Sequence, residues 1–116
     1  YILRQMTFIL KGLEFNYENI EKNLKLTRGL CLAEKVMIEL VNKGVGRQEA
    51  HEALRRCAIK AWSENKTFKE AILEDSTLNK IVSEKELDEW LDPKNYLGTA
   101  VEQVERAVKD LRGENY

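Results

Sequence analysis

Two apolar-periodic segments joined by a short glycine-containing link constrain this chain more than any other feature. They span residues 29–63, and the link reads Lys43-Gly44-Val45-Gly46. In both segments apolar residues recur every three or four positions, with charged residues opposite, which is the pattern of an amphipathic helix. Two such helices joined by so short a link are expected to pack antiparallel. The apolar sets are Leu30, Ala33, Val36, Met37, Leu40 and Val41, then Ala50, Ala53, Leu54, Cys57, Ala58, Ala61 and Trp62.

The segments before this pair also follow a helical period. The apolar pattern over residues 1–12 is that of a helix ending at Gly12. Asn16 can cap a short helix over residues 17–26, and we expect its Ile20 and Leu24 to point inward. Because Tyr1 is not an initiator methionine and the helical pattern is already running there, the chain is expected to be part of something longer.

After Trp62 the same capping pattern precedes each of three predicted helices. The pattern is a serine or threonine followed three residues later by glutamate, which matches the capping box and predicts a helix start. No alternating apolar run bounded by turn residues predicts a strand. We therefore expect one all-α, compact domain over residues 1–116, with six or seven helices around the antiparallel pair. The three capping matches are Thr67 with Glu70, Ser83 with Glu86, and Thr99 with Glu102.

Charge and hydropathy exclude several classes of partner. The net charge is −1, and the 19 basic residues are spread along the chain, whereas nucleic-acid binders concentrate a basic excess on one face. No apolar run approaches the roughly twenty residues that span a bilayer, and no signal peptide opens the chain. We therefore predict a cytoplasmic protein with no nucleic-acid or membrane partner.

The inventory of reactive side chains is small. His51 is the only histidine, and we interpret it as a helix-surface or packing residue. The serines stand at helix ends or caps, so the chain lacks a nucleophile-and-base set. Cys31 and Cys57 fall within the apolar helical patterns and complete no metal site. Buried free thiols are the main interpretation, and a disulfide between facing helices is the alternative. Trp62 and Trp90 are large enough to anchor the core.

Four stretches in a fixed order resemble the C-terminal domain of the adenylosuccinate lyases, members of the fumarase and aspartase superfamily. Together they extend over most of the chain, and a Lys-Gly turn followed by Arg-Gln-Glu-Ala and then a Leu-Asp-Pro element makes the set specific. Carboxymuconate cycloisomerases carry a similar tail and are the alternative within the superfamily. The stretches are NLKLTRGL at 23–30, VNKGVGRQEAH at 41–51, AIKAW at 58–62 and LDPKNYLG at 91–98.

The resemblance implies an enzyme of purine biosynthesis that eliminates fumarate from adenylosuccinate to give AMP, and from succinyl-aminoimidazole-carboxamide ribotide. It implies a homotetramer built on a central helical bundle, to which residues 1–13 would contribute the end of a helix. A purine nucleotide is the implied substrate, and neither a metal nor an organic cofactor is implied. The family's catalytic serine loop and histidines match no position here, so we assign no catalytic residue to this chain.

Three residues at the entry to the helix pair are the candidates for contact with the active-site cleft. They are Thr27, Arg28 and Gly29, because the family's domain borders that cleft. For Thr27 the simpler interpretation is a helix cap, with a ligand contact by Arg28 as the alternative. From a different class of function, a helix-turn-helix-like interaction module would use the turn at Gly44 to Gly46 and the Arg55-Arg56 pair.

Overall fold

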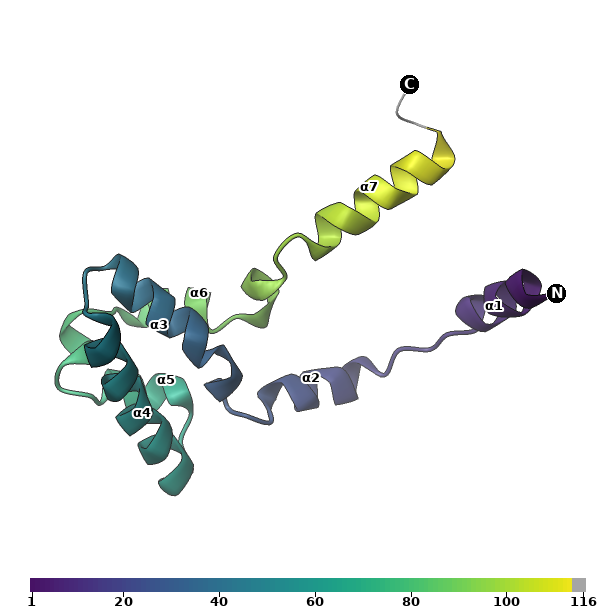
Figure 1. Cartoon of the computed structure of the whole chain (residues 1–116). Coiled ribbons are helices and arrows are strands. Elements are labelled where there is room, and N and C mark those ends of the chain that lie inside the picture. Colours follow the sequence, from purple (N-terminus) through teal and green to yellow (C-terminus); the bar gives the residue numbers. More distant parts are fainter. Residues whose placement is uncertain (114–116) are drawn as a thin grey trace.

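The computed structural model describes residues 1–113, and all the regular secondary structure in that range is helical, with no strand (Figure 1). The all-α prediction is therefore confirmed. Three short 3-10 helices connect seven α-helices. In chain order these are α1 (Ile2–Lys11), α2 (Tyr17–Lys25), η1 (Leu30–Leu32), α3 (Ala33–Asn42), α4 (Arg47–Ser63), α5 (Phe68–Leu73), η2 (Leu78–Lys80), α6 (Glu84–Trp90), η3 (Pro93–Tyr96) and α7 (Ala100–Arg112).

The predicted antiparallel pair is α3 and α4, and it forms the centre of a compact body with α5 and α6. The turn between the pair needs a positive φ of 93° at Gly44, where glycine carries no steric penalty. Side chains from all four α-helices interlock in one core, and all the buried hydrophobic residues among residues 1–113 lie between Leu32 and Trp90. The largest fully buried side chains are Phe68, Leu40, Ile72, Leu78, Leu87, Val36 and Cys57.

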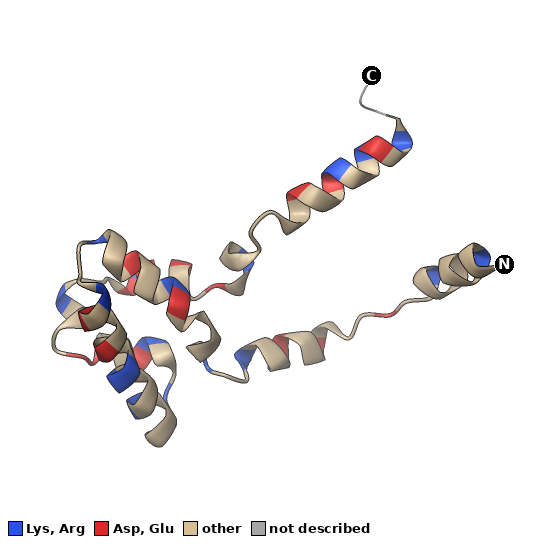
Figure 2. Ribbon diagram, viewed as in Figure 1, with Lys and Arg blue, Asp and Glu red and all other residues tan. Residues whose placement is uncertain are grey.

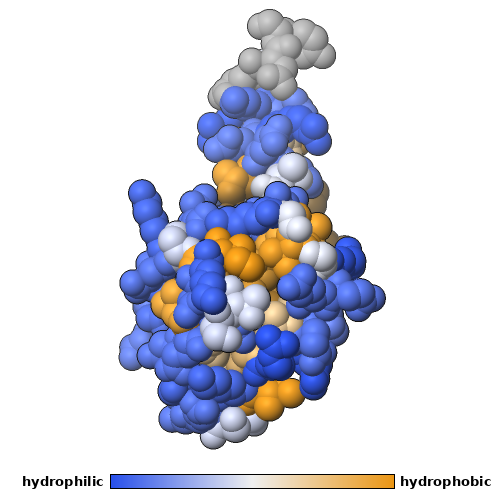
Figure 3. All heavy atoms as spheres, turned by 90° about the vertical axis from the view of Figure 1, so that its left-hand side faces the viewer, coloured by the Kyte–Doolittle hydropathy of each residue, from blue (hydrophilic) through white to orange (hydrophobic). Residues whose placement is uncertain are grey.

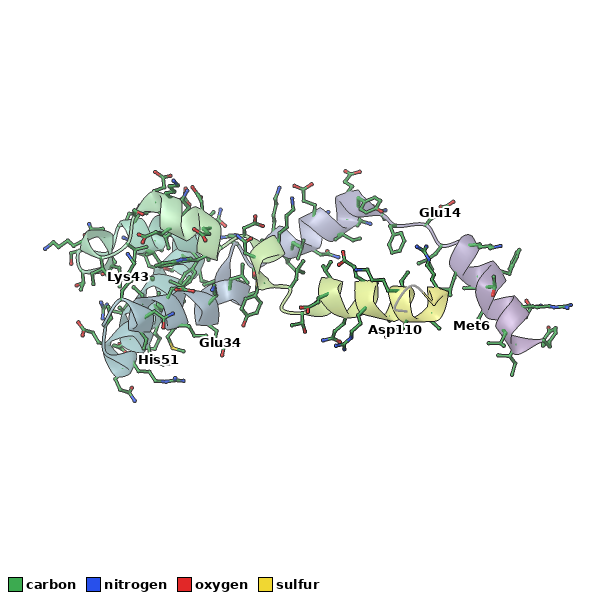
Figure 4. The ribbon with its side chains drawn as sticks, turned by 90° about the horizontal axis from the view of Figure 1, so that it is seen from above. Met6, Glu14, Glu34, Lys43, His51 and Asp110 are labelled. Atoms are coloured by element: carbon green, nitrogen blue, oxygen red, sulfur yellow. The ribbon has the colours of Figure 1, made fainter. Side chains whose placement is uncertain are left out.

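Two helical arms extend from the same side of this body (Figure 1). One consists of α1 and α2, and the other is α7; none of these three helices contains a buried residue. The radius of gyration is 19.8 Å, against about 13 Å for a compact domain of this length. In Figure 4 Met6 and Asp110 lie on the arms, away from the body that carries Lys43, His51 and Glu34. Compaction is thus confined to the body.

Local sequence explains why α5 and α6 begin where they do. The Thr67 hydroxyl accepts a hydrogen bond from the Glu70 amide, and the Glu70 carboxylate accepts one from the Thr67 amide. Ser83 and Glu86 form the same reciprocal pair. Both capping boxes are therefore confirmed. Asn16 also caps α2 as predicted, by accepting a hydrogen bond from the Asn19 amide.

The third predicted capping box does not form. α7 begins at the predicted place, but Thr99 has φ −94° and ψ 15° instead of the extended geometry of a capping residue. Its hydroxyl accepts a hydrogen bond from the Gln103 side chain, 2.6 Å away, and not from the Glu102 amide. The prediction was wrong because Thr99, which follows Gly98 at a positive φ of 55°, is itself near-helical, and its hydroxyl is not placed to accept from the Glu102 amide.

Four predictions of burial were also wrong. Ile20 and Leu24 are 45% and 50% exposed, because α2 lies outside the body. Cys31 is exposed, because it lies in η1 and not in α3; Cys57 is buried, and both thiols are free. Trp62 is 73% exposed. Ala61, the residue before it, is only 2% exposed, so Trp62 lies on a face of α4 that is turned away from the core.

Charges of both signs alternate over the surface (Figure 2). The Arg55-Arg56 pair does not form a basic surface, because Arg55 is paired with Glu52 at 2.8 Å and Arg56 lies 3.4 Å from Asp75. Figure 3 shows hydrophobic residues ringed by hydrophilic ones on the outer face of the body. Within residues 1–113, no helix is both long enough and apolar enough to span a membrane.

Candidate functional site

The three candidate residues form the link between α2 and η1. Thr27 accepts a hydrogen bond from the Cys31 amide at 3.3 Å, so its hydroxyl satisfies an N–H group at the start of η1, as a helix cap does. Arg28 and Gly29 follow with positive φ values of 52° and 93°. Two successive residues in this region turn the chain sharply into the body.

This turn is fixed from the body side. The Arg28 carbonyl accepts a hydrogen bond from the Phe68 amide at 3.0 Å, and the Phe68 side chain is fully buried. A Cβ atom on Gly29 would lie 3.6 Å from the Phe68 Cβ. The backbone at Arg28 is therefore anchored to the first residue of α5, while the Arg28 side chain is exposed.

Arg28 and Gly29 line a groove of about 810 Å³ between α2 and the segment from Leu91 to Lys94. Thr27 does not line it. The lining combines apolar side chains with charged ones, which suits a ligand that is partly apolar and carries charge. Its lining residues are Tyr17, Ile20, Glu21, Leu24, Lys25, Arg28, Gly29, Cys31, Leu32, Thr67, Leu91, Asp92, Pro93 and Lys94.

Some of the charged side chains around the groove form ion pairs or hydrogen bonds, and others do not. Lys25 and Glu21 form an ion pair at 2.5 Å, and the hydrogen bond from Lys25 lowers the pKa of the Glu21 carboxyl. The Asp92 carboxylate accepts a hydrogen bond from the Lys94 amide at 3.0 Å and so caps η3. Arg28 forms no ion pair within the described part of the chain. The same holds for Lys94, so the Arg28 guanidinium and the Lys94 ammonium are the cations of this groove that are available to meet an anionic group, and only the guanidinium can bind it through two parallel hydrogen bonds.

The groove lacks the pairing of a serine with a histidine base. None of its lining residues is a histidine or a serine. His51 is exposed on α4, at a separate and smaller cavity of about 310 Å³ lined mainly by α3 and α4 side chains. No group of three or more His, Cys, Asp or Glu side chains among residues 1–113 is arranged to hold a metal. The arrangement can bind and orient a ligand, but it supplies no histidine for proton transfer.

Sequence reasoning identified one wall of this groove and missed the other. Arg28 and Gly29 were candidates, whereas α2 was assigned to the interior through Ile20 and Leu24. The stretch at 91–94 belongs to the LDPKNYLG motif, which by itself assigns no role to these residues. The apolar stripe of α2 shows that this helix has a face to cover, but periodicity does not reveal that η3 lies opposite it.

Comparisons with known proteins give a consistent family. The model of the adenylosuccinate lyase C-terminus matches residues 29–107. The chain is 48% identical over 109 residues to an adenylosuccinate lyase of Archaeoglobus fulgidus and 43% identical over 114 residues to one of Methanocaldococcus jannaschii. These alignments cover 94% and 96% of this chain. The chain spans about a quarter of the length of these relatives, 24% and 25%.

A solved structure of an enzyme with a different activity has a similar fold. The crystal structure of 3-carboxy-cis,cis-muconate lactonizing enzyme from Pseudomonas putida matches with a TM-score of 0.82 and 38% identity. It covers 92% of this chain and 24% of the enzyme's own chain. The matching family model and the two relatives, taken with the helical body and its ordered motifs, establish that the chain belongs to the adenylosuccinate lyase C-terminal family.

Proposed function

We propose that this chain is the C-terminal domain of an adenylosuccinate lyase. The full-length enzyme eliminates fumarate from adenylosuccinate to give AMP, and from succinyl-aminoimidazole-carboxamide ribotide, in the purine biosynthesis of the cytoplasm. Its substrate is a purine nucleotide, and it acts as a homotetramer through a central helical bundle to which residues 1–13 contribute. The observation that carries the proposal is the family match over residues 29–107, supported by the relatives that share this activity in name.

Within that enzyme the domain forms part of the wall of the active-site cleft and does not perform the chemistry. In the family a serine on a glycine-rich loop removes a proton and a histidine supplies one, and the groove described above has neither residue type. What the groove does offer is Arg28, an exposed cation on an anchored backbone. Arg28 binds an anionic group of the nucleotide substrate, and Gly29 lets the chain turn there.

The activity is tested with the full-length chain that contains this domain. Purified enzyme is mixed with adenylosuccinate, and the conversion is followed by ultraviolet absorbance. The second candidate is a carboxymuconate cycloisomerase, favoured by the fold match to the Pseudomonas putida enzyme, so 3-carboxymuconate is assayed in parallel. We expect turnover of adenylosuccinate alone. Turnover of 3-carboxymuconate instead would transfer the domain to the cycloisomerase branch.

The role of Arg28 is tested by Arg28→Ala in the same enzyme. A hydrogen bond to a charged group contributes about 1.5–3 kcal/mol, so the KM for adenylosuccinate should rise by roughly 10- to 100-fold. If Arg28 binds substrate and transition state equally, kcat stays within about twofold. Arg47→Ala, which removes an exposed arginine at the start of α4, is the matched control and should leave KM unchanged. An unaltered KM in Arg28→Ala would remove Arg28 from the site.

A further inference from the structure

The arm formed by α7 carries an apolar seam that nothing in the described chain covers. Val101, Val104, Val108 and Leu111 recur at alternating spacings of three and four, and they are 55%, 64%, 39% and 89% exposed. α7 contains no buried residue and extends away from the body (Figure 1). Four large apolar side chains in a regular row are therefore left in contact with solvent.

The helix itself needs a partner. α7 has 13 residues, and isolated helices of about that length are marginal in water. Three of its four seam residues are valines, whose branched side chains lose rotamer freedom in a helix. The Glu102 side chain does not form the capping box that would help the first turn. Packing of the seam is the contribution that remains to hold this segment helical.

The shape of the seam identifies the kind of partner. The four residues occupy the a and d positions of two consecutive heptads, a narrow stripe that fits against one other helix. Ala100 and Ala107 border it on one side, where they permit a close approach of that helix. Charged residues occupy the opposite face of α7, so that face is expected to contact solvent, and α7 is not a helix that is covered on all sides. These charged residues include Glu102, Arg106 and Lys109.

We propose that α7 packs through Val101, Val104, Val108 and Leu111, in the manner of a coiled coil, against one helix of the N-terminal region of the full-length lyase. This inference rests on the proposed function. The family model describes the C-terminus, and the relatives are about four times as long as this chain, so a large preceding region is available to supply that helix.

A second copy of α7 is a poorer occupant. The helix is about 20 Å long and a helix about 10 Å wide, so the seam covers roughly 200 Å². Stable interfaces bury about 800 Å² on each partner. A seam this small can still hold a partner helix that belongs to the same chain. The connecting polypeptide then raises the effective concentration of the partner helix at the seam.

Amide hydrogen exchange of the full-length chain tests the proposal. Amides of α7 should exchange at least ~100-fold more slowly than in an unstructured peptide of the same sequence, at every protein concentration used. Exchange at the unstructured rate would overturn the inference. Protection that disappears on dilution would assign the seam to a second copy and would overturn it as well.

Two variants locate the protection on the seam. Val104→Asp should accelerate exchange of the α7 amides by ~10-fold or more, because a charge is buried in an apolar contact. Gln103→Glu adds the same charge to the neighbouring polar face and keeps the length of the side chain, so that the Thr99 hydroxyl, which accepts from Gln103, can donate to the new carboxylate; its effect should stay below ~2-fold. Equal acceleration by both variants would show that the seam is not covered.

The adenylosuccinate assay on the same preparation separates this inference from the proposed function. An active enzyme with unprotected α7 amides overturns the packing of the seam alone. A protected α7 in a chain without activity on adenylosuccinate supports the packing and overturns the proposed activity.

Discussion

Arg28 and Gly29 are two successive residues with positive φ, at the point where the chain enters the body. Such a φ is unusual at Arg28, because it is not a glycine. Backbone geometry of this kind costs of order 1–3 kcal/mol at a residue with a side chain, and it persists only where the surroundings enforce it. Here the enforcing contact is the hydrogen bond from the Phe68 amide to the Arg28 carbonyl. The turn therefore aims the Arg28 side chain from a rigid support, which is what a binding residue requires.

Gly29→Ala should destabilise the protein through its backbone and not through crowding. The new Cβ would have ordinary contacts of 3.6 Å with Phe68 Cβ and 3.9 Å with Leu91 Cδ2, but φ is 93°. We expect a loss of about 1–2 kcal/mol in the free energy of unfolding, measured by urea titration. Gly46→Ala, at φ −59°, should change it by less than about 0.5 kcal/mol. Similar losses in both variants would contradict the argument.

Two residues show where reasoning from single positions fails. Cys31 was placed in the helical pattern of the first segment, but η1 precedes α3 and its tighter geometry rotates the side chain off the buried stripe. Trp62 lies about 80° around α4 beyond Leu54, which is the outermost buried residue on that side, so its side chain falls outside the buried stripe. Cys57, at the centre of that stripe, was predicted correctly, and burial raises the pKa of its thiol to about 11.

At the scale of elements, the turn between α3 and α4 is bound to α6 by one lysine. The Lys43 ammonium lies 2.6 Å from a Glu86 oxygen, donates to the Ile81 carbonyl at 2.9 Å, and lies 5.7 Å from the centre of the Trp90 ring. Glu86 is also the glutamate of the capping box that starts α6. One carboxylate therefore both starts a helix and joins it to the central pair.

Glu86→Gln should reduce the sensitivity of the protein to acid. The hydrogen bond from Lys43, followed by the one from the Ser83 amide, lowers the pKa of Glu86 from 4.5 to about 2. A lowered folded-state pKa contributes stability above the unfolded value, and that stability is lost as the pH falls from about 4.5 through 2. We expect a smaller decrease in Tm over this range in Glu86→Gln.

The control for this prediction is Glu89→Gln, which neutralises an exposed glutamate on the same helix. Its Tm should follow the wild-type curve as the pH is lowered. A Glu86→Gln variant with an unchanged pH profile would show that the contact with Lys43 does not contribute to stability in solution.

Element positions were predictable wherever the determining contacts are local. The capping boxes at Thr67 and Ser83 involve residues three positions apart, so the sequence contains everything that forms them. Thr99 matches the same pattern, yet its backbone is near-helical after the positive φ of Gly98 and does not adopt the capping geometry. Likewise, the motif at Arg28 indicated one wall of the groove, whereas the opposition of α2 to Pro93 depends on the path of the whole body between them.

At the scale of the whole molecule, the core and the arms should respond differently to mutation. Leu40 is fully buried, and Val41, the next residue, is 39% exposed. Leu40→Ala should cost about 2–5 kcal/mol of unfolding free energy through lost burial and a cavity. Val41→Ala should cost less than about 1 kcal/mol. Urea unfolding followed by circular dichroism measures both, and equal costs would contradict the assignment of the core.

The overall shape was the least predictable property. Amphipathic periodicity identified apolar faces on α1, α2 and α7 in the same way as on α3 and α4, but only the latter are covered within residues 1–113. Periodicity states that a face requires a covering and does not state which segment provides it. The compact all-α domain that the sequence predicts is present, and its buried residues within the described range lie between Leu32 and Trp90.

The buried residues come from one continuous stretch of the described chain, so the body could be exchanged as a unit between related proteins. Because the buried side chains of the described residues come from one uninterrupted stretch, the body can be transplanted as a cassette without dividing its core. The arms on either side of it carry the surfaces that must suit a host enzyme. A chimaera joined at the two boundaries of the body would thus keep the core of this chain, and the arms of the recipient protein would keep their own contacts.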